Sequence, residues 1–449
     1  MQQSIVFRRP APIVGLVLLG IFGVLYRIDR ESYFTILQWI GIVPFRYPFL
    51  DGQYILSSVE CWKQGVDIYI DNPCDVLNRT FDYSPLWLRA TFLPTDKIWT
   101  NPLGLGLATT FFGFLFFFPQ SKRPFEAVVV VLATISTMTV FAVERANVDL
   151  AMFILSTLAA LWLTRGRHAR WLGYSAILGA GLLKFYPIVL FIFTLSERPR
   201  NFLRINIIIG FVLISITWFF LPEIVKSVAN IPRPSYFGDA FGAINLPFGL
   251  VQAFFTSTGF DAENGHWVLY FSIALLVVLA VDTVWRAHKF LHREGFSVSL
   301  EGLPNWDRAL LVAGAALVCG CFFAGPSIGY RGILLLLILP GLLALTRRDV
   351  TPWVKRLCLT AVMMVVFLMW GEGIRQFLST AADRLGVPER FGSPVAIAFW
   401  FLRELVWWRV ISLLGAILFW FVATSETGRI ALQIIAPAER RLRPHLLGR

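Results

Sequence analysis

Five places in this chain of 449 residues put polar or ionisable side chains inside or beside apolar sequence: Asp51, the run 144–149 (Glu-Arg-Ala-Asn-Val-Asp), Lys184, Asn245 and Tyr330-Arg331. A charge in apolar surroundings is costly, so such residues usually have a partner or a function. A carboxylate such as that of Asp51 can take the proton of an attacking hydroxyl, and Arg or Lys side chains can hold a phosphate. If the five places meet, their chemistry suits a reaction on a phosphorylated substrate.

A structural interpretation competes with this one at several of these positions. Glu144 and Arg145 could form a local ion pair, and Arg331 could anchor a helix at a membrane interface. Lys184 could extend its long side chain to a backbone carbonyl. The residue types alone leave both interpretations open.

The composition places the chain in a membrane. Apolar residues make up 57% of the chain and charged residues 15%, whereas about a quarter of the residues of soluble proteins are charged. Apolar stretches that approach the roughly 20 residues of a spanning helix recur along the chain. Examples are 11–26, 103–118, 125–143, 205–221, 267–280, 309–324 and 332–345. We therefore expect an all-α, polytopic membrane protein with about ten spanning helices, and we exclude a soluble domain.

Basic residues outnumber acidic residues by 40 to 28 and lie between the apolar stretches. This placement is typical of a topological signal, because the cytoplasmic loops of membrane proteins are rich in Lys and Arg. It argues against nucleic-acid binding. The basic segments are 8–9, 121–123, 165–170, 197–204, 285–293, 347–356 and 429–449. Placing them all inside predicts cytoplasmic termini and a location in the inner (cell) membrane of a bacterium.

All basic segments fall on one side only if residues 171–195 return to the side from which they came. Basic residues flank this segment, and Lys184, Tyr186 and Pro187 lie in its middle. Two helices of about a dozen residues each, meeting where proline removes a backbone donor, would form a re-entrant hairpin. The alternative is one kinked crossing, which would invert every later helix.

The long loops then lie on the outer face, at about residues 29–102, 222–266 and 371–405. Apolar spacing predicts interfacial helices over 30–43 and 83–93 of the first loop. Four carboxylates of this loop are interpreted as solvated: Asp67, Asp71, Asp75 and Asp82. No repeat or linker divides the chain. We therefore expect a single domain over 1–449, with the five polar places converging at its outer face.

The cysteines divide by compartment. Cys319, Cys321 and Cys358 lie in or beside apolar helices, where a buried thiol usually acts as a small hydrophobic group. They lack the further ligands of a metal site, and we predict none. Cys61 and Cys74 share the first outer loop, where an oxidising periplasm would let them pair. Two free thiols are the alternative.

Motifs in the first outer loop resemble those of glycosyltransferase family 87. Asp51-Gly-Gln-Tyr54, Lys63-Gln-Gly65-Val-Asp-Ile-Tyr69 and Phe81-Asp-Tyr83-Ser-Pro85-Leu86 follow, in order, the family's D-x-x-x-Y or D-x-x-Y, G-x-D/P-x-Y and F-x-Y-P-P patterns. Later matches keep the same order. They are Asn147 at a G-Q-x-N turn, 173–187 at a glycine-rich run into K-x-x-P, Asn245 at an outer-loop Asn, and 327–331 at an S-W-x-H-H motif. The resemblance covers about 48–345 and rests on this succession.

The resemblance implies a fold of the GT-C class and a hexosyltransferase that works with inversion. In known members the sugar is mannose and the donor is a polyprenyl-phosphate sugar, so a lipid or glycan acceptor at the periplasmic face and a product in the cell envelope are implied. Such an enzyme needs no nucleotide, and no Gly-rich phosphate loop is visible in the sequence. We expect no cofactor. The need for a divalent metal stays open, because GT-C enzymes differ in it.

Roles follow for individual residues. By position, Asp51 is the expected catalytic base. Lys184, Arg331 and Arg145 are the expected ligands of the donor phosphate. Substrate contacts are expected from Tyr54, Tyr83, Asn147, Asn245 and Tyr330.

The sequence departs from the family pattern in three places. Tyr330-Arg331 replaces the histidine pair of many members, Ser84 stands where a proline is usual, and Glu144-Arg145 replaces Gly-Gln. Arginine is a good phosphate ligand, but the first change could also mean a different sugar. A transporter or flippase for lipid-linked sugars is an alternative function, and a structural partner in polymerisation is another. Transporters often have two related halves with broken helices, and only one broken segment is visible in this sequence.

Overall fold

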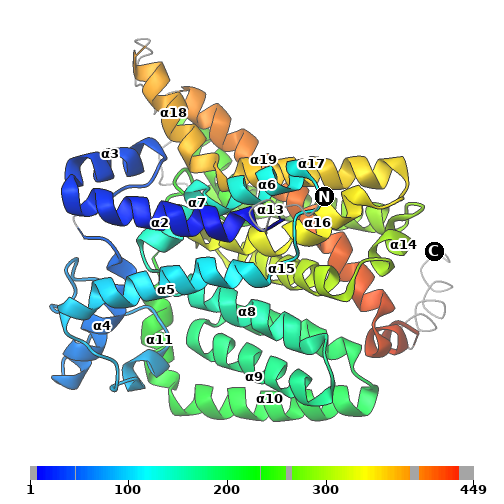
Figure 1. Cartoon of the computed structure of the whole chain (residues 1–449), viewed down its shortest axis with the longest axis horizontal. Helices are drawn as coiled ribbons and strands as arrows, with labels where there is room; N and C mark the ends of the chain where they lie inside the picture. Colours follow the sequence, from blue (N-terminus) through cyan, green and yellow to red (C-terminus); the bar gives the residue numbers. More distant parts are fainter. Residues whose placement is uncertain (1–7, 46, 233, 259–264, 385–393, 434–449) are drawn as a thin grey trace.

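The computed structural model describes residues 8–45, 47–232, 234–258, 265–384 and 394–433, and its regular structure is almost entirely helical (Figure 1). Seven helices of this described part are long and apolar enough to cross a membrane. They are α2 (Pro10–Ile28), α5 (Thr100–Phe114, with η2, Lys97–Trp99, and η3, Leu115–Phe117), α10 (Pro199–Phe219), α13 (Gly265–Leu291), α15 (Asn305–Ala324), α17 (Pro352–Met369) and α19 (Pro394–Thr424).

Two bent helix pairs would raise the number of spans in the described ranges to nine. The pair α6 (Pro124–Thr134) and α7 (Thr137–Glu144) bends by 42°, and the pair η6 (Gly329–Leu337) and α16 (Leu339–Arg347) bends by 40°. These helices confirm the prediction of an all-α, polytopic helical protein. The expected count of about ten crossings stays a prediction.

The remaining elements hold much of the polar sequence. The helices are α3 (Arg30–Trp39), α4 (Leu50–Lys63), η1 (Pro85–Arg89), α8 (Asp149–Leu163), α9 (Arg167–Lys184), η4 (Tyr186–Ser196), α11 (Leu221–Ala229), α12 (Asn245–Thr258), α14 (Phe296–Glu301) and α18 (Gly371–Arg384). Two short strands, β1 (Ala240–Phe241) and β2 (Ser327–Ile328), pair in antiparallel fashion.

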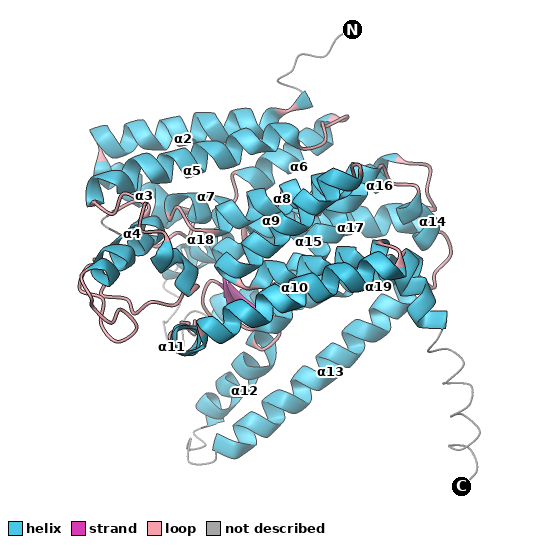
Figure 2. Ribbon diagram, turned by 90° about the horizontal axis from the view of Figure 1, so that it is seen from below, coloured by secondary structure: helices cyan, strands magenta, loops and turns pink. Residues whose placement is uncertain are grey.

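Helix α15 is the centre of the packing. It packs against α8, α16, α19, η4 and η6. Of the residues in its most apolar 18-residue stretch, 78% are buried inside the protein, against 11% for the corresponding stretches of α10 and α13. Small residues permit this close packing. A Cβ on Gly314 would lie 2.5 Å from Ile338, and one on Gly320 would lie 2.8 Å from Val189. Figure 2 shows α15 inside the bundle and α13 at its margin. Helix α15 thereby holds η4 and η6, which carry residues of the candidate site.

Residues 171–195 form a helical hairpin in the structure. Helix α9 ends at Lys184, Phe185 adopts a positive φ of 25°, and η4 returns along α9. The two ends of the hairpin meet again, since Arg170 and Glu197 form an ion pair with an Nη1–Oε1 distance of 3.3 Å. The first limb has 18 residues and the second 11, so the first is longer than the dozen expected. The depth at which the hairpin sits in a membrane stays a prediction.

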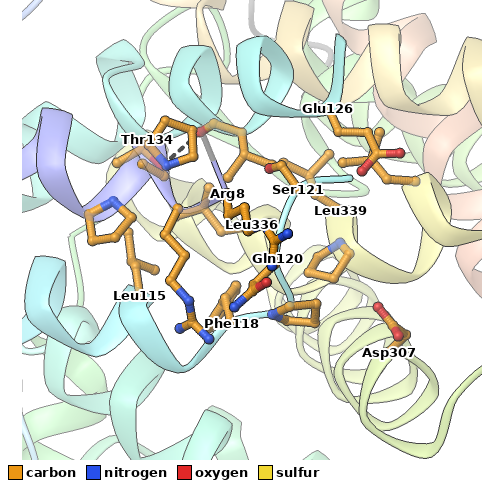
Figure 3. A pocket seen from close by; sticks show the side chains of 18 of the residues that line it. Arg8, Leu115, Phe118, Gln120, Ser121, Glu126, Thr134, Asp307, Leu336 and Leu339 are labelled. Atoms are coloured by element: carbon orange, nitrogen blue, oxygen red, sulfur yellow. Dashed lines mark hydrogen bonds between the residues drawn. The ribbon is translucent and has the colours of Figure 1, made fainter. Parts of the chain in front are cut away.

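As far as the structure describes them, the basic segments gather at one end of the bundle, which we call the basic end. Arg347 pairs with Glu126 at 2.7 Å, and Thr427 donates a hydrogen bond to the Glu197 carbonyl at 2.6 Å. A small cavity of about 40 Å³ between Arg8, Glu126 and Asp307 lies there (Figure 3). The opposite end, at the left of Figure 1, holds α3, α4 and α11, and α4 carries Asp51. The orientation of the two ends in a membrane, and the side of the termini, stay predictions.

Some of the helices and loops predicted at the outer face are present in the structure, and others are not. The helix expected over 30–43 is α3, which Asp29 caps through the backbone N–H groups of Glu31 and Ser32. The helix expected over 83–93 is only the five-residue 3-10 turn η1. The loop expected at 371–405 contains α18, and its last part belongs to α19. Portions of the three expected loops (46, 233, 259–264 and 385–393), and the basic tail after residue 433, lie outside the described residues.

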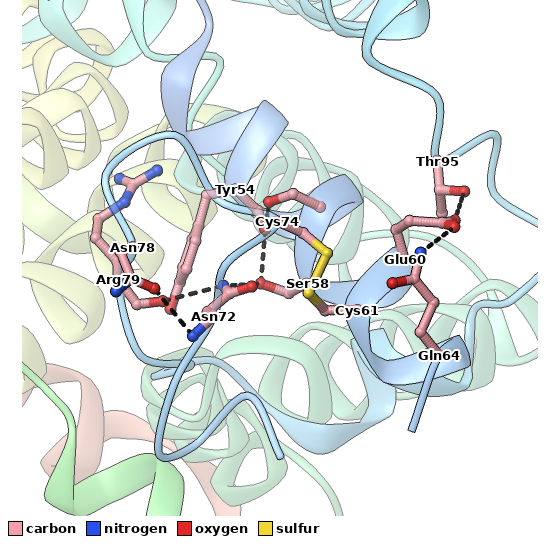
Figure 4. Close-up of a disulfide and its surroundings, with 11 residues drawn as sticks. Tyr54, Ser58, Glu60, Cys61, Gln64, Asn72, Cys74, Asn78, Arg79 and Thr95 are labelled. Carbon is pink, nitrogen blue, oxygen red and sulfur yellow. Dashed lines mark hydrogen bonds between the residues drawn. A yellow bond between two sulfur atoms is a disulfide. The ribbon is translucent and has the colours of Figure 1, made fainter. Parts of the chain in front are cut away.

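A disulfide ties together the two parts of the first outer loop. It joins Cys61, in α4, to Cys74, and Figure 4 shows it beside Tyr54, Asn72 and Arg79. Asn72 donates to the Ser58 hydroxyl and to the Arg79 carbonyl, at 3.0 Å each. The helix that carries Asp51 is therefore cross-linked to the loop that carries Arg79.

Mass spectrometry of the alkylated protein tests this bond. The chain has five cysteines, and Cys319, Cys321 and Cys358 are free thiols in the structure. We expect three alkyl groups on the denatured, unreduced protein and five after reduction. Five without reductant would contradict the bond. Reduction should also lower the free energy of unfolding, by about 3 kcal/mol for a loop of this size.

Candidate active site

Asp51 is held at the start of α4 by backbone contacts to a distant turn. The N–H groups of Asp51 and Gly52 both donate to the Arg145 carbonyl, at 3.0 and 3.2 Å. Gly52 permits this approach, because a Cβ there would already lie 3.3 Å from the Ala146 Cβ. Asp51 lies in the first helical turn, where the helix dipole favours a carboxylate. Its position therefore depends on the turn between α7 and α8.

Two side chains orient the Asp51 carboxylate. Arg79 Nη1 donates to Oδ1 at 3.0 Å, and Asn147 Nδ2 donates to Oδ2 at 2.7 Å. The Asp51 side chain is 12% exposed. Because each carboxylate oxygen can accept more than one hydrogen bond, both oxygens retain capacity for a further donor.

Asn147 connects Asp51 to a cation. Its Oδ1 accepts hydrogen bonds from Lys184 Nζ at 3.1 Å and from the Asp149 backbone N–H at 2.9 Å. The side chain is fully buried. Only one orientation of the amide lets its nitrogen serve Asp51 and its oxygen serve Lys184. The interruption of the helix at Phe185 positions this contact, because it makes Lys184 the last residue of α9.

Asp149 is a fully buried carboxylate that three elements share. Lys184 Nζ lies 2.9 Å from Oδ1, and the Tyr186 hydroxyl donates to the same oxygen at 2.9 Å. Arg331 Nε lies 3.5 Å from Oδ2, an ion pair too long for a hydrogen bond, and Arg331 Nη1 donates to the Ser327 hydroxyl at 2.8 Å. Two positive charges against one negative charge leave this group with a net +1, which suits an anionic ligand.

Aromatic side chains surround the cations. Lys184 Nζ lies 5.1 Å from the Tyr83 ring centroid and 5.9 Å from that of Tyr330, and Arg331 stacks over Tyr186 at 5.2 Å. Such contacts favour a cation that is partly removed from water. Tyr83 and Tyr330 thus meet Lys184, as a shared site requires.

Tyr54 has a different place. Its hydroxyl lies within hydrogen-bond distance of two acceptors, the Thr80 carbonyl at 2.7 Å and Asp82 Oδ1 at 3.0 Å, and Arg79 stacks on its ring. Burial raises the pKa of the Asp82 carboxyl, and the Tyr54 hydrogen bond opposes this rise. The contacts of Tyr54 therefore hold the loop around Arg79 in place. Its role in substrate binding stays a prediction.

Arg145 and Asn245 do not join the described cluster through their side chains. Arg145 pairs with Glu144 at 3.2 Å, donates to the Val43 carbonyl at 2.8 Å and stacks on Phe45. It reaches Asp51 only through its backbone carbonyl. Asn245 is buried at the start of α12, and no hydrogen-bond partner for its amide is found in the described part of the chain. The binding roles expected for these two residues stay predictions.

Sequence reasoning missed residues that complete the cluster. In the sequence Asp149 stands out only as part of its run, and no motif indicates a role for Arg79 or for the Tyr186 hydroxyl. Asp75 was wrongly interpreted as solvated: its side chain has no exposed surface and accepts from Arg79 at 3.0 Å. Asp82 is half-buried, and the Tyr54 hydroxyl lies 3.0 Å from its Oδ1. Asp67 is 41% exposed and pairs with Lys226, while Asp71 is exposed.

The fold and this cluster define an all-helical, multi-pass membrane protein with a connected network of cations and carboxylates at one end of its bundle. Among the described residues no group of three or more His, Cys, Asp or Glu side chains is arranged to hold a metal ion. No protein-family model, curated protein or solved structure matches the chain. Its membership of glycosyltransferase family 87 therefore stays a hypothesis based on the motifs.

The shared carboxylate gives a stability prediction. Asp149→Asn would leave Lys184 and Arg331 without their counter-charge, and breaking a buried ion pair costs on the order of 3 kcal/mol. Asp67→Asn removes the same charge from a pair whose side chains are 41% and 48% exposed, so it should cost about 1 kcal/mol or less. Thermal unfolding of both variants in detergent checks this. Equal losses would contradict the central role of Asp149.

Proposed function

We propose that the protein is a lipid-linked glycosyltransferase of the GT-C class, acting at the outer face of a bacterial inner membrane. It transfers a sugar, mannose by family resemblance, from a polyprenyl-phosphate donor to a lipid or glycan acceptor. One observation carries the proposal. The carboxylate expected to act as base and the two cations expected to hold phosphate belong to one network of hydrogen bonds and ion pairs, Asp51–Asn147–Lys184–Asp149–Arg331.

The proposed reaction is an inverting displacement at the anomeric carbon of the sugar. The acceptor hydroxyl attacks from the face opposite the phosphate, and Asp51 takes its proton. The bond between the anomeric carbon and the phosphate oxygen breaks, and its electron pair leaves on that oxygen. The products are the glycosylated acceptor and the lipid monophosphate. Arg79 and Asn147 orient the base during this step.

The charges of the network match the charge that develops on the leaving group. A donor phosphodiester carries one negative charge, and the departing lipid phosphate gains a second. Lys184 and Arg331 therefore favour the transition state over the bound donor. Arg331 is 22% exposed and is still accessible to a ligand.

An apolar groove offers a path for the lipid chain of a substrate. The groove has a volume of about 120 Å³ and lies among α2, α3, α5 and α7. Leu18, Phe22 and Leu105 contribute to its walls, and it reaches Glu144. Glu144 directly precedes Arg145, whose carbonyl binds the backbone of Asp51. A chain in this groove would end close to the proposed base.

Asp51→Asn tests the base. The amide keeps the shape of the side chain but cannot accept the proton, so transfer should fall roughly 10² to 10⁴-fold while donor affinity changes little. Asp67→Asn is the control, because it makes the same change in a partly exposed pair of the same loop. Turnover and donor binding are measured on folded protein of each variant. Near-parental turnover of Asp51→Asn would contradict the assignment and make Glu144 the next candidate.

The cations give a separate prediction. Lys184→Ala and Arg331→Ala should lower kcat more than they weaken donor binding, since the charge they oppose grows as the phosphate leaves. Arg331→Lys should recover only part of the rate, because a point charge does not replace a planar two-pronged contact. Arg89→Ala, which removes an exposed ion pair with Glu223, serves as the control.

If both cations are structural only, the alanine variants lose thermal stability while each folded molecule keeps its full rate. Turnover per folded molecule, measured beside the melting temperature, separates the two cases. Unchanged turnover in both variants would refute the phosphate site.

A further inference from the structure

The basic end of the bundle contains a large groove that the proposed reaction does not use. It has a volume of about 980 Å³ and lies where α9 and α10 begin. Five arginines line it: Arg167, Arg170, Arg198, Arg200 and Arg204. Glu197 and Glu426 are the carboxylates of its lining, so the formal charge is five minus two, or +3. We propose that this groove binds the phosphate of an anionic membrane phospholipid.

Most of these arginines are available to a ligand. Glu197 is buried, pairs with Arg170 and accepts from the Tyr174 hydroxyl, so it neutralises one cation of the group. Among the residues that the structure describes, the other four arginines have no carboxylate partner within ion-pair distance, and all four are exposed. Guanidinium groups bind phosphate oxygens in a planar, two-pronged manner.

The two helices add a backbone contribution at the same place. Helix α9, of 18 residues, begins at Arg167, and helix α10, of 21 residues, begins at Pro199. Neither N-terminus has a side-chain cap. Their first-turn N–H groups and the positive ends of their dipoles lie among residues that line the groove, and such helix ends bind phosphate. Two helix ends and five arginines therefore favour the same ligand.

The surroundings of the groove favour a lipid over a soluble phosphate. Trp171 lines the groove and is 40% exposed, and interfacial tryptophans typically lie at the level of the lipid headgroups. Beyond it, α10 presents Leu203, Ile207 and Phe211 on its exposed surface. Only 11% of the residues in the most apolar 18-residue stretch of α10 are buried inside the protein, as expected of a lipid-facing helix. Acyl chains can lie along α10 while the headgroup occupies the groove.

Lipid bound in this groove would also stabilise the helical hairpin formed by α9 and η4. The groove lies at the base of the hairpin, where Arg170 and Glu197 join α9 to the end of η4 and Thr427 bonds the Glu197 carbonyl. A ligand that binds only the folded arrangement stabilises it. The inference does not depend on the reaction proposed for the opposite end.

Lipid titration of the purified full-length protein in detergent, followed by native mass spectrometry and melting temperature, tests the proposal. We expect phosphatidylglycerol to stay bound and to raise the melting temperature, and phosphatidylcholine and soluble glycerol phosphate to do neither. Equal binding of the two lipids would overturn the proposal. Tight binding of glycerol phosphate alone would overturn the assignment to a lipid.

Charge-matched variants locate the site. The triple variant Arg198→Gln, Arg200→Gln, Arg204→Gln should bind phosphatidylglycerol more than tenfold more weakly. The control triple variant Lys289→Gln, Lys355→Gln, Arg356→Gln removes the same charge from exposed residues outside the groove and should bind as the parent does. Equal loss in both variants would show a diffuse attraction and refute the groove. If the first variant fails to fold, the lipid comparison on the parent protein still decides.

Discussion

The buried carboxylate of Asp149 is the interaction on which the arrangement of the polar end depends. It has no exposed surface, yet Lys184, Tyr186 and Arg331 all contact it, from the end of α9, the start of η4 and the start of η6. Two cations buried together would repel each other strongly without it. By neutralising one of the two charges, Asp149 lets the hairpin tip and η6 meet.

The position of Asp51 follows from the same junction. Asn147 lies two residues before Asp149, and its amide joins the carboxylate of Asp51 to Lys184. A second link runs through Trp87, whose indole N–H donates to the Leu183 carbonyl at 3.1 Å, so the first loop also rests on the hairpin tip. A substitution at Asp149 should therefore change the position of Asp51. The two carboxylates are connected through the side chains of Asn147 and Lys184.

Composition and local pattern predicted the features that depend on short stretches of sequence. Apolar length indicated the helices, the basic residues around Lys184 indicated a chain reversal, and an outer loop with two cysteines suggested a pair. Composition and local pattern do not indicate which residues tertiary packing brings together. Arg79 lies 28 residues from Asp51, and nothing in the local pattern of either residue indicates the pairing.

Burial explains the remaining differences. Asp75 stands in a polar stretch and was expected to be solvated, but Arg79 gives it a partner inside the loop. The loop predicted at about 371–405 overlaps the first part of α19, which carries Arg403 and Glu404. In the structure these two residues pair with each other at 3.0 Å, and Arg403 also donates to the Gly238 and Ala240 carbonyls. Because their charges have partners, these two residues can lie inside a long apolar helix.

We propose that one end of this bundle breaks the bond between a sugar and a lipid phosphate. The most direct measurement incubates the purified protein in liposomes with a polyprenyl-phosphate sugar labelled in both the sugar and the lipid, together with a lipid extract as acceptor and without any nucleotide sugar. Our account predicts that free polyprenyl phosphate accumulates and that the sugar label moves to another molecule, at a rate that Asp51→Asn abolishes. Movement of the intact, doubly labelled donor across the bilayer without cleavage would contradict it and would identify a flippase instead.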